Sequence, residues 1–245
     1  LIKILIKKMI NISIEARMTS ARLPGKTLKL INGKPALEIM VNRVKHTKLA
    51  NKIIIATTTN CEDDVIVEWC KMNNINYFRG SENNVYERVL KTHQKFNTDI
   101  IVELTGDCIL ITAELVDYAI QLYLDNNYDY ISVSDPGSMS AQVYSLKTLK
   151  SVTHDRELEY LDKEHVTPYL YTSGKYKILL TKMYEDLDCP EVSFPLDTKQ
   201  DLEILDKICK NFDNFSFSFK EIVKFIKKNP DIPKINKNIK RKGLT

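Results

Sequence analysis

Short apolar runs alternate with amphipathic segments along the first half of this chain. Ile10, Ile12 and Ile14 are separated by single polar residues, and this period of two is typical of a strand at 10–14. Later apolar runs of similar length predict strands at 52–57, 75–78, 99–104 and 128–133. Apolar residues spaced three and four apart predict helices between them, at 36–47, 62–72, 85–96 and 113–124. This alternation indicates βαβ units, so we expect an α/β fold with a mostly parallel sheet and helices on both faces.

The pattern is shorter and more mixed after residue 134. Asp135, Pro136 and Gly137 favour a turn or a mobile loop at 134–140 rather than a linker between domains. The remaining periodicity predicts strands at 142–144, 176–181 and 192–196, and helices at 146–152, 156–169, 199–210 and 219–228.

The composition is that of an ordinary globular protein. The chain has 245 residues, 43% hydrophobic and 28% charged, with a formal net charge of +4, which gives no indication of a nucleic-acid partner. No apolar stretch reaches the ~18 residues that a membrane-spanning helix needs, so we expect no membrane insertion. The five cysteines are odd in number and form no C-x-x-C pair, which argues against a disulfide framework or a zinc cluster and favours a reducing cytoplasm.

The two ends of the chain differ from the middle. Residues 1–8 lack the features of a signal peptide, and because Met9 directly precedes the first clear strand we interpret 1–8 as an N-terminal extension; a further strand at 2–6 is the alternative. The main domain is then expected at 9–212, followed by a C-terminal helix and basic tail at 213–245. The tail lacks interleaved aromatic residues, which favours a solvated terminus over nucleic-acid binding. Crowded phenylalanines before the last helix favour a homodimer contact unless a core covers them: Phe212, Phe215, Phe217 and Phe219.

Three cations follow the first strand within a short loop. Arg17, Arg22 and Lys26 lie in 15–26, directly after the strand at 10–14. Loops at the carboxyl ends of strands are where open α/β sheets bind ligands, so these side chains are expected to converge on a polyanion such as a nucleoside triphosphate. An ordinary solvated basic loop is the alternative.

Two aspartates also follow apolar strands of this pattern. Asp107 comes after the run at 100–104 and is reached through Gly106, a residue that lets the backbone approach a ligand closely. Asp197 follows the apolar run at 192–196. Magnesium binds few carboxylates together with phosphate oxygens and water, so the pair is a candidate Mg²⁺ site. Asp197 could instead cap the helix that begins near Lys199.

Six separated motifs, in order, resemble one known family. They occupy 12–26, 56–64, 78–82, 105–108, 164–167 and 196–203, and together they are similar to the SpsF type of spore-coat polysaccharide cytidylyltransferases. That type is related to the acylneuraminate and Kdo cytidylyltransferases, which make CMP-sugars. The resemblance covers about residues 9–210. It implies a nucleotide-diphospho-sugar transferase fold, which is a Rossmann-like α/β/α sandwich, and transfer of CMP from CTP to an acceptor oxygen with release of pyrophosphate.

The resemblance also implies roles for individual residues. Arg17, Lys26 and Asp107 would be catalytic, and Asp107 and Asp197 would hold Mg²⁺. The nucleotide would be bound by Ala16, Arg17, Met18, Arg22, Lys26, Ala56, Thr57, Thr58, Arg79, Gly80, Ser81, Gly106 and Asp107. The acceptor, an acidic sugar or related molecule for surface-glycan synthesis, would be bound by Ser140, Gln142, Glu164 and His165. Fixed cations and Mg²⁺ would neutralise charge on the reacting phosphates during attack at the α-phosphorus.

The sequence departs from the family pattern at two places. Glu15 stands where relatives usually carry Gln, which places a negative charge beside the proposed phosphate loop. Ser140 and Gln142 stand where carboxylates are common, so acceptor contacts are expected to differ. Two other interpretations stay open: a nucleotide-binding relative without turnover, and a sugar-1-phosphate nucleotidyltransferase using UTP or GTP. The Gly-x-Gly-Thr-Arg loop typical of the second is absent from the sequence.

Overall fold

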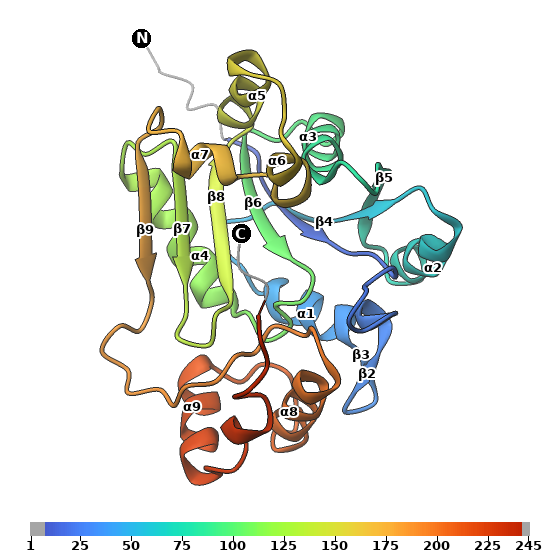
Figure 1. Cartoon of the computed structure of the whole chain (residues 1–245), viewed down its shortest axis with the longest axis vertical. Helices are drawn as coiled ribbons and strands as arrows, with labels where there is room; N and C mark the ends of the chain where they lie inside the picture. Colours follow the sequence, from blue (N-terminus) through green and yellow to red (C-terminus); the bar gives the residue numbers. More distant parts are fainter. Residues whose placement is uncertain (1–7, 242–245) are drawn as a thin grey trace.

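The computed structural model describes residues 8–241 and is organised around one large sheet. The strand order is β5-β4-β1-β6-β8-β7-β9 (Figure 1). Neighbouring strands pair in parallel except where β8 meets β6 and β7, so the expected mostly parallel sheet is confirmed. The bounds are β1 Ile10–Glu15, β4 Lys52–Thr58, β5 Asn76–Gly80, β6 Ile100–Thr105, β7 Tyr130–Ser134, β8 Ser140–Ser145 and β9 Ile178–Lys182.

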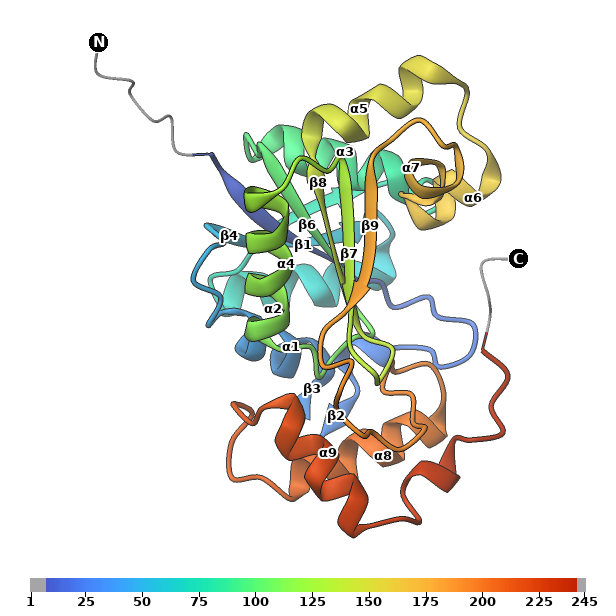
Figure 2. The same cartoon turned by 90° about the vertical axis from the view of Figure 1, so that its left-hand side faces the viewer.

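Helices cover both faces of this sheet, as the alternation of strands and helices predicts. On one face lie α1 (Ala36–Val44), α2 (Asp64–Met72) and α4 (Ala113–Asp125) (Figure 2). The other face carries α3 (Val85–Lys95), α5 (Leu146–Asp155), α6 (Tyr160–His165) and α7 (Pro168–Thr172). Beyond the carboxyl ends of the strands lie α8 (Lys199–Lys210), α9 (Phe219–Lys228) and a small hairpin of β2 (Leu30–Ile31) and β3 (Lys34–Pro35). Single 3-10 turns occur at Lys26–Leu28, Cys61–Asp63 and Pro233–Ile235.

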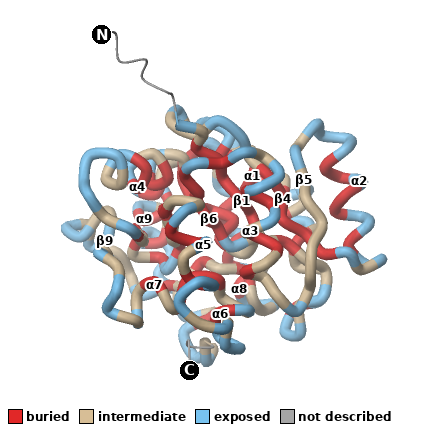
Figure 3. The backbone as a smooth tube through the Cα atoms, turned by 90° about the horizontal axis from the view of Figure 1, so that it is seen from above, coloured by how far each residue is buried: buried red, intermediate tan, exposed pale blue. Residues whose placement is uncertain are grey.

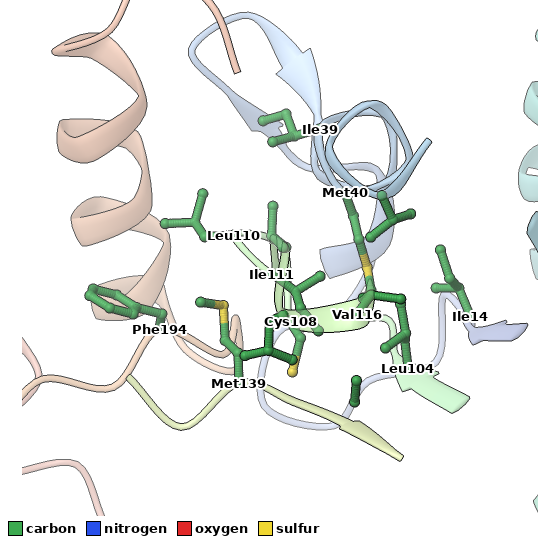
Figure 4. Close-up of a cluster of buried hydrophobic side chains, with 14 of the residues drawn as sticks. Ile14, Ile39, Met40, Leu104, Cys108, Leu110, Ile111, Val116, Met139 and Phe194 are labelled. Carbon is green, nitrogen blue, oxygen red and sulfur yellow. The ribbon is translucent and has the colours of Figure 1, made fainter. Parts of the chain in front are cut away.

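The hydrophobic core runs through the central strands, which are buried on both faces (Figure 3). The segment after β6 is part of it, because Cys108, Leu110 and Ile111 pack with Met139 and Phe194 from two other segments (Figure 4). Burying an aliphatic or aromatic side chain of this size contributes roughly 1.5–3 kcal/mol. The loops that precede and follow these side chains are therefore held firmly at the carboxyl edge of the sheet.

The C-terminal helix packs on the same core. Phe217, Phe219 and Ile222 are buried in it, and the ring of Phe217 stacks on that of Phe212 with centroids 4.2 Å apart. The guanidinium of Arg43 lies 4.4 Å from the centroid of the Phe217 ring. The crowded aromatic run that we considered as a homodimer contact is thus largely covered within the chain.

The strand expected at 192–196 is wrong. Val192, Phe194 and Leu196 alternate inward as a strand would, but their backbone joins no sheet. Instead, the N–H of Phe194 donates to Gly137 O (3.0 Å) and that of Leu196 to Asp107 O (2.9 Å). Alternating burial therefore arises here from an extended segment that bonds to two different loops, and Pro195, which lacks an N–H, could not support a ladder.

The single helix expected at 156–169 is also wrong, because the chain breaks it into α6 and α7. Val166 lies between them at φ 64° and ψ −54°, a left-handed conformation that is strained for a β-branched residue. The N–H of Thr167 donates to His165 O at 2.7 Å, which closes a tight three-residue turn. Pro168 then begins α7 at a position where its missing N–H costs nothing.

The alternative strand at 2–6 falls entirely on residues 1–7, which lie outside the described residues. Within 8–241, no helix has the length and the apolar character required to cross a membrane.

Candidate active site

The predicted site residues gather where β1 and β6 lie side by side. The strands of this sheet that come next after β1 in the chain, β4 and β5, lie on one side of it. β6 and all later strands lie on its other side. Such a reversal of strand order is where open α/β sheets bind ligands, outside the carboxyl ends of the strands. Gly106 makes the close approach possible, because a Cβ at this position would lie 2.3 Å from the carbonyl oxygen of Glu15. The glycine therefore allows close packing against β1, and the ligand contact expected of it stays a prediction.

Lys26 joins the two aspartates of the predicted metal site. Its Nζ lies 3.1 Å from Asp107 Oδ2 and 3.0 Å from Asp197 Oδ1. Arg22 Nη2 lies 2.9 Å from the other oxygen of Asp197. The two aspartates are held together by the backbone as well, since Leu196 donates its N–H to Asp107 O. Four of the five charged groups predicted to meet do so in one continuous network.

The network is only partly shielded from water. The side chain of Lys26 is 18% exposed, and those of Asp107 and Asp197 are 23% and 16% exposed. Burial acts to lower the pKa of Lys26, but the two carboxylates outweigh it and the pKa lies above its usual value. The two carboxylates around the Lys26 ammonium, with room for solvent beside them, resemble a partial oxygen shell of Mg²⁺. Phosphate oxygens and water would complete such a shell. The residues present therefore fit the expected metal.

Arg17 does not join this network. Its Nη1 lies 3.6 Å from Glu82 Oε1, and the carbonyl oxygen of Arg17 accepts from Thr27 Oγ1 (2.9 Å). Glu82 also accepts hydrogen bonds from Thr19 Oγ1 and Asn60 Nδ2, both 2.5 Å, and these bonds hold its pKa below the usual range. Arg17 is thus tied to the carboxyl side of β4 and β5, on the side of the predicted base and ribose contacts.

Asp63 fixes the start of the basic loop against β4. It is fully buried, its Oδ1 accepts from the backbone N–H of Met18 (2.7 Å), and its Oδ2 accepts from Thr58 Oγ1. Ala16 is bonded to β4 through its N–H, which donates to Ala56 O (3.3 Å). These contacts bring together the predicted nucleotide-binding segments 16–18 and 56–58.

Thr57 differs from its neighbours, because side chains alternate along a strand and its own points to the opposite face from those of Ala56 and Thr58. It is fully buried, and its hydroxyl has no hydrogen-bond partner among the described residues. Its predicted contact with a nucleotide stays a prediction.

The β5 end of the site is rigid. Arg79 donates to the carbonyl oxygens of Thr58 (2.8 Å) and Asn60 (2.7 Å) and pairs with Asp64 at 2.6 Å, so its guanidinium holds the protein's own loop. Gly80 lies against α3, and a Cβ there would approach the Arg88 side chain to 2.9 Å. Ser81 is held by Arg88, whose Nη1 donates to its carbonyl oxygen at 2.5 Å.

The predicted acceptor residues lie under α6 and α7. Gln142 Oε1 accepts from both Tyr130 Oη and Thr167 Oγ1, each at 2.6 Å, which fixes the amide and leaves its Nε2 as a donor. Glu164 and His165 end α6, with Oε2 and Nε2 separated by 4.0 Å and both side chains more than one third exposed, at 35% and 38%. Ser140 begins β8 opposite Ser134 of β7. The tight turn at Val166 connects Glu164 and His165 to Thr167, the residue that bonds to Gln142.

A second pair of acidic residues lies beneath this region. Glu103 is opposite Gln142 in the pairing of β6 and β8, is buried, and accepts a hydrogen bond from Tyr144 Oη. Burial raises its pKa to about 7. Burial also raises the pKa of Glu15 well above its usual value, and the neighbouring Glu103 adds to the effect while Arg88 opposes it. The negative charge expected at Glu15 is therefore weakened by its surroundings.

The sequence interpretation assigned no role to several residues that shape the site. Glu103 could have been singled out from the sequence, because it is the one acidic residue in the apolar run at 100–104. Asp63 and Glu82 lie inside two of the recognised motifs, but their partners are far away in the chain. Nothing in the local pattern indicates that Tyr130 and Thr167 would hold Gln142.

No group of three or more His, Cys, Asp or Glu side chains within residues 8–241 is arranged to hold a metal ion. A metal at Asp107 and Asp197 would therefore rely on these two carboxylates and on oxygens from phosphate and water.

Comparisons with known proteins agree with the geometry. Residues 12–228 match the profile of the cytidylyltransferase family. The chain is 30% identical over 225 residues to the spore coat polysaccharide biosynthesis protein SpsF of Bacillus subtilis, which covers 89% of this chain and 94% of SpsF.

Solved structures extend the likeness to three dimensions. A cytidylyltransferase from Leptospira borgpetersenii superposes with a TM-score of 0.86 at 30% identity, covering 96% of this chain and 100% of that one. CMP:2-keto-3-deoxy-manno-octonic acid synthetase, solved in complex with CTP, superposes with a TM-score of 0.65 at 15% identity, covering 83% and 99%. The expected Rossmann-like nucleotidyltransferase fold is confirmed. The chain belongs to the cytidylyltransferase family of nucleotidyltransferases, as its motifs indicate.

Proposed function

We propose that this protein transfers CMP from CTP to an oxygen of an acidic sugar or related acceptor, with release of pyrophosphate, to supply precursors for a surface glycan. The observation that carries the proposal is the contact of Lys26 with both Asp107 and Asp197, beside Arg22. These groups provide fixed cations for a triphosphate and two carboxylates for Mg²⁺ at one place. The names of the relatives support the substrates, since one is a polysaccharide biosynthesis protein and another was solved with CTP.

The reaction joins an acceptor oxygen to the α-phosphorus of CTP while the bond to the departing pyrophosphate breaks and the acceptor loses its proton. Lys26 and Arg22 bind the phosphates, whereas Arg17, which pairs with Glu82, lies on the β4 side near the predicted base and ribose contacts. Mg²⁺, when held by Asp107 and Asp197, neutralises negative charge on the reacting phosphate oxygens. Because the cations are fixed before the nucleotide binds, little reorganisation is needed as charge develops on the leaving group.

The acceptor is positioned by the residues below α6. Gln142 offers its Nε2 to an oxygen of the acceptor, while Tyr130 and Thr167 hold the other side of the amide. Glu164 and His165 border the same region from the end of α6. Holding the acceptor close to the α-phosphorus in a fixed orientation supplies much of the acceleration in reactions of this type.

We place the protein in the cytoplasm in this proposal. All five cysteines are unpaired thiols, which is usual in a reducing compartment. Activated nucleotide sugars are also made where CTP is available.

A panel of substrates tests the function. The purified protein is incubated with Mg²⁺, each of the four ribonucleoside triphosphates in turn, and acceptors that include Kdo, N-acetylneuraminate and phosphorylated sugars. Pyrophosphate release is followed enzymatically and the coupled product by mass spectrometry. We expect release with CTP and an acidic sugar, and a product that contains both CMP and the acceptor. Turnover with UTP or GTP and a sugar 1-phosphate, or nucleotide binding without any product, would contradict the proposal.

A further inference from the structure

The last described residues return to the carboxyl edge of the sheet. After α9, the chain passes α8 and rises beside it (Figure 2). There Arg241 contacts Asp201 with two parallel bonds, from Nη1 to Oδ2 at 2.9 Å and from Nη2 to Oδ1 at 2.6 Å. Asn236, from the same returning segment, donates to Asp201 Oδ1 at 2.8 Å. The segment that its composition suggested would be a solvated tail is therefore anchored to α8.

Asp201 connects this anchor to the predicted metal site. Its Oδ2 accepts from the backbone N–H of Asp197 at 3.1 Å and from that of Thr198 at 2.8 Å. It also accepts from Thr198 Oγ1, completing the capping box of α8. Asp197 is the residue whose two oxygens contact Lys26 and Arg22. Hydrogen bonds thus link the returning segment, through Arg241 and Asp201, to the backbone N–H of Asp197.

Two other capping boxes in the described chain differ in their partners: the buried Asp162 of α6 also pairs with an arginine, Arg156, whereas the box of α9 forms without one. In α9 the same arrangement forms between Ser218 and Glu221, whose carboxylate is exposed and has no arginine partner. Asp201 is instead fully buried, at 0% exposure. Burial acts to raise its pKa, but the bonds from Arg241, Asn236 and Thr198 outweigh it and hold the pKa below its usual value. A buried carboxylate that loses such a partner is left without its paired bonds, so Arg241 contributes to holding Asp201 in place.

We propose that Arg241 is a positioning residue of the nucleotidyl-transfer site: it fixes Asp201, which holds the backbone of Asp197 so that its carboxylate faces Lys26 and Asp107. This inference rests on the proposed function, in which Asp197 holds Mg²⁺. Groups that orient metal ligands typically contribute 10- to 100-fold to metal affinity or activity. Arg241 thereby couples the C-terminal segment to metal binding, although its own contacts are with Asp201.

Calorimetric titration of CTP in the absence of acceptor tests this role. The dissociation constant is measured with Mg²⁺ and again with EDTA, and their ratio gives the gain in affinity that the metal provides. We expect Arg241→Gln to reduce this gain about tenfold and to leave the affinity in EDTA unchanged. Lys240→Gln, the matched control, removes the same charge from the exposed neighbouring residue and should change neither value. Arg241→Lys keeps the charge but not the paired geometry, so an intermediate gain is expected.

The outcomes separate this inference from the proposed function. If Asp197→Asn loses the gain while Arg241→Gln keeps it and only lowers the melting temperature, Arg241 is purely structural and the inference fails alone. An equal loss of CTP affinity in EDTA would mean that Arg241 contacts the nucleotide directly, which also overturns it. If Asp197→Asn itself keeps the full gain, the metal assignment of the proposed function fails and the inference falls with it. Should Arg241→Gln not fold, the comparison is made with Arg241→Lys, for which an undiminished gain overturns the inference.

Discussion

The proposed phosphate side and the proposed acceptor side of this site are built in different ways. On the phosphate side, Lys26, Asp107 and Asp197 form ion pairs whose side chains are between 16% and 23% exposed. On the acceptor side, the buried Glu103 accepts a hydrogen bond from Tyr144, and the half-buried Gln142 accepts hydrogen bonds from the hydroxyls of Tyr130 and Thr167. The two sides are adjacent, since Gly106 packs on Glu15 at the boundary between them.

This difference indicates different ways of responding to a ligand. Ion pairs near the surface are individually weak, because water competes for both partners, so the pairs of Lys26 can exchange for phosphate oxygens and a metal at small cost. On the acceptor side, two part-buried hydrogen bonds hold the same amide oxygen and fix Gln142 before any ligand arrives, and the bond of Glu103 is fully buried and costly to break. We therefore expect the proposed phosphate side to exchange partners on binding and the proposed acceptor side to be preorganised.

The largest effect is expected from the phosphate side. Asp107→Asn should reduce pyrophosphate release with Mg²⁺ by about 10³-fold, because loss of one metal ligand removes several kcal/mol of charge stabilisation in the transition state. The fold should be retained, since Asp107 is partly exposed and Asn preserves its shape. Steady-state rates with CTP, together with circular dichroism, measure both quantities.

Asp125→Asn is the matched control for this variant. Asp125 is an exposed residue at the end of α4 and contacts only Gln121 among the described residues, so the rate should stay at the wild-type value. Turnover of Asp107→Asn within a few-fold of wild type would remove Asp107 from the metal site. The phosphate side would then be a structural ion-pair network instead.

The sequence could predict the phosphate side but not the acceptor side, and the reason is physical. Arg22, Lys26 and Asp107 follow the ends of adjacent parallel strands, and this position alone brings them together. Asp197 reaches them through one backbone hydrogen bond from Leu196, although no strand precedes it. Four of the five expected groups thus converge, for a partly different structural reason, whereas Arg17 pairs with Glu82 instead.

The acceptor side depends on contacts between residues far apart in the chain. Gln142 is held by Thr167, which a tight turn places beside it, and the periodicity at 156–169 predicted one continuous helix there. Arg241 is a stronger case, since a basic residue in a polar segment gives no indication of a buried carboxylate partner. The periodicity of a strand or helix indicates on which face of that element a residue lies. It does not indicate which distant segment packs on that face.

An intermediate effect is expected on stability from the acceptor side. The pKa of Glu103 is raised to about 7 in the folded protein from the usual 4.5, because burial disfavours its charged form. Below pH 4.5 the carboxyl group is protonated in both states, so the raised pKa costs no stability. Between pH 4.5 and pH 7 the folded state holds a proton that the unfolded state releases, so stability falls as the pH rises. Glu103→Gln does not titrate. The difference in the free energy of unfolding, Glu103→Gln minus wild type, should therefore rise by up to about 3 kcal/mol between pH 5 and pH 8.

Urea denaturation at the two pH values measures this difference. Glu68→Gln, on the exposed face of α2, is the control and should leave the pH dependence of unfolding unchanged. A constant difference between Glu103→Gln and wild type at both pH values would show that Glu103 is ionised in the folded state throughout. The acceptor side would then be as charged as the phosphate side, and the comparison would lose its basis.

The smallest effect separates the two sides most directly. Gln142→Glu keeps an oxygen that can accept from Tyr130 and Thr167, but it replaces the Nε2 donor with a second oxygen. An acidic acceptor then loses one hydrogen bond to a charged group, worth about 1.5 kcal/mol or roughly tenfold in KM, and meets a negative charge. The KM for Kdo should rise by this factor while the dissociation constant of CTP stays unchanged, because the phosphate side is untouched. A rise in the CTP dissociation constant with no change in the KM for Kdo would place Gln142 on the nucleotide side. An unchanged or lower KM for Kdo, with CTP binding intact, would mean that the Nε2 of Gln142 does not contact the acceptor.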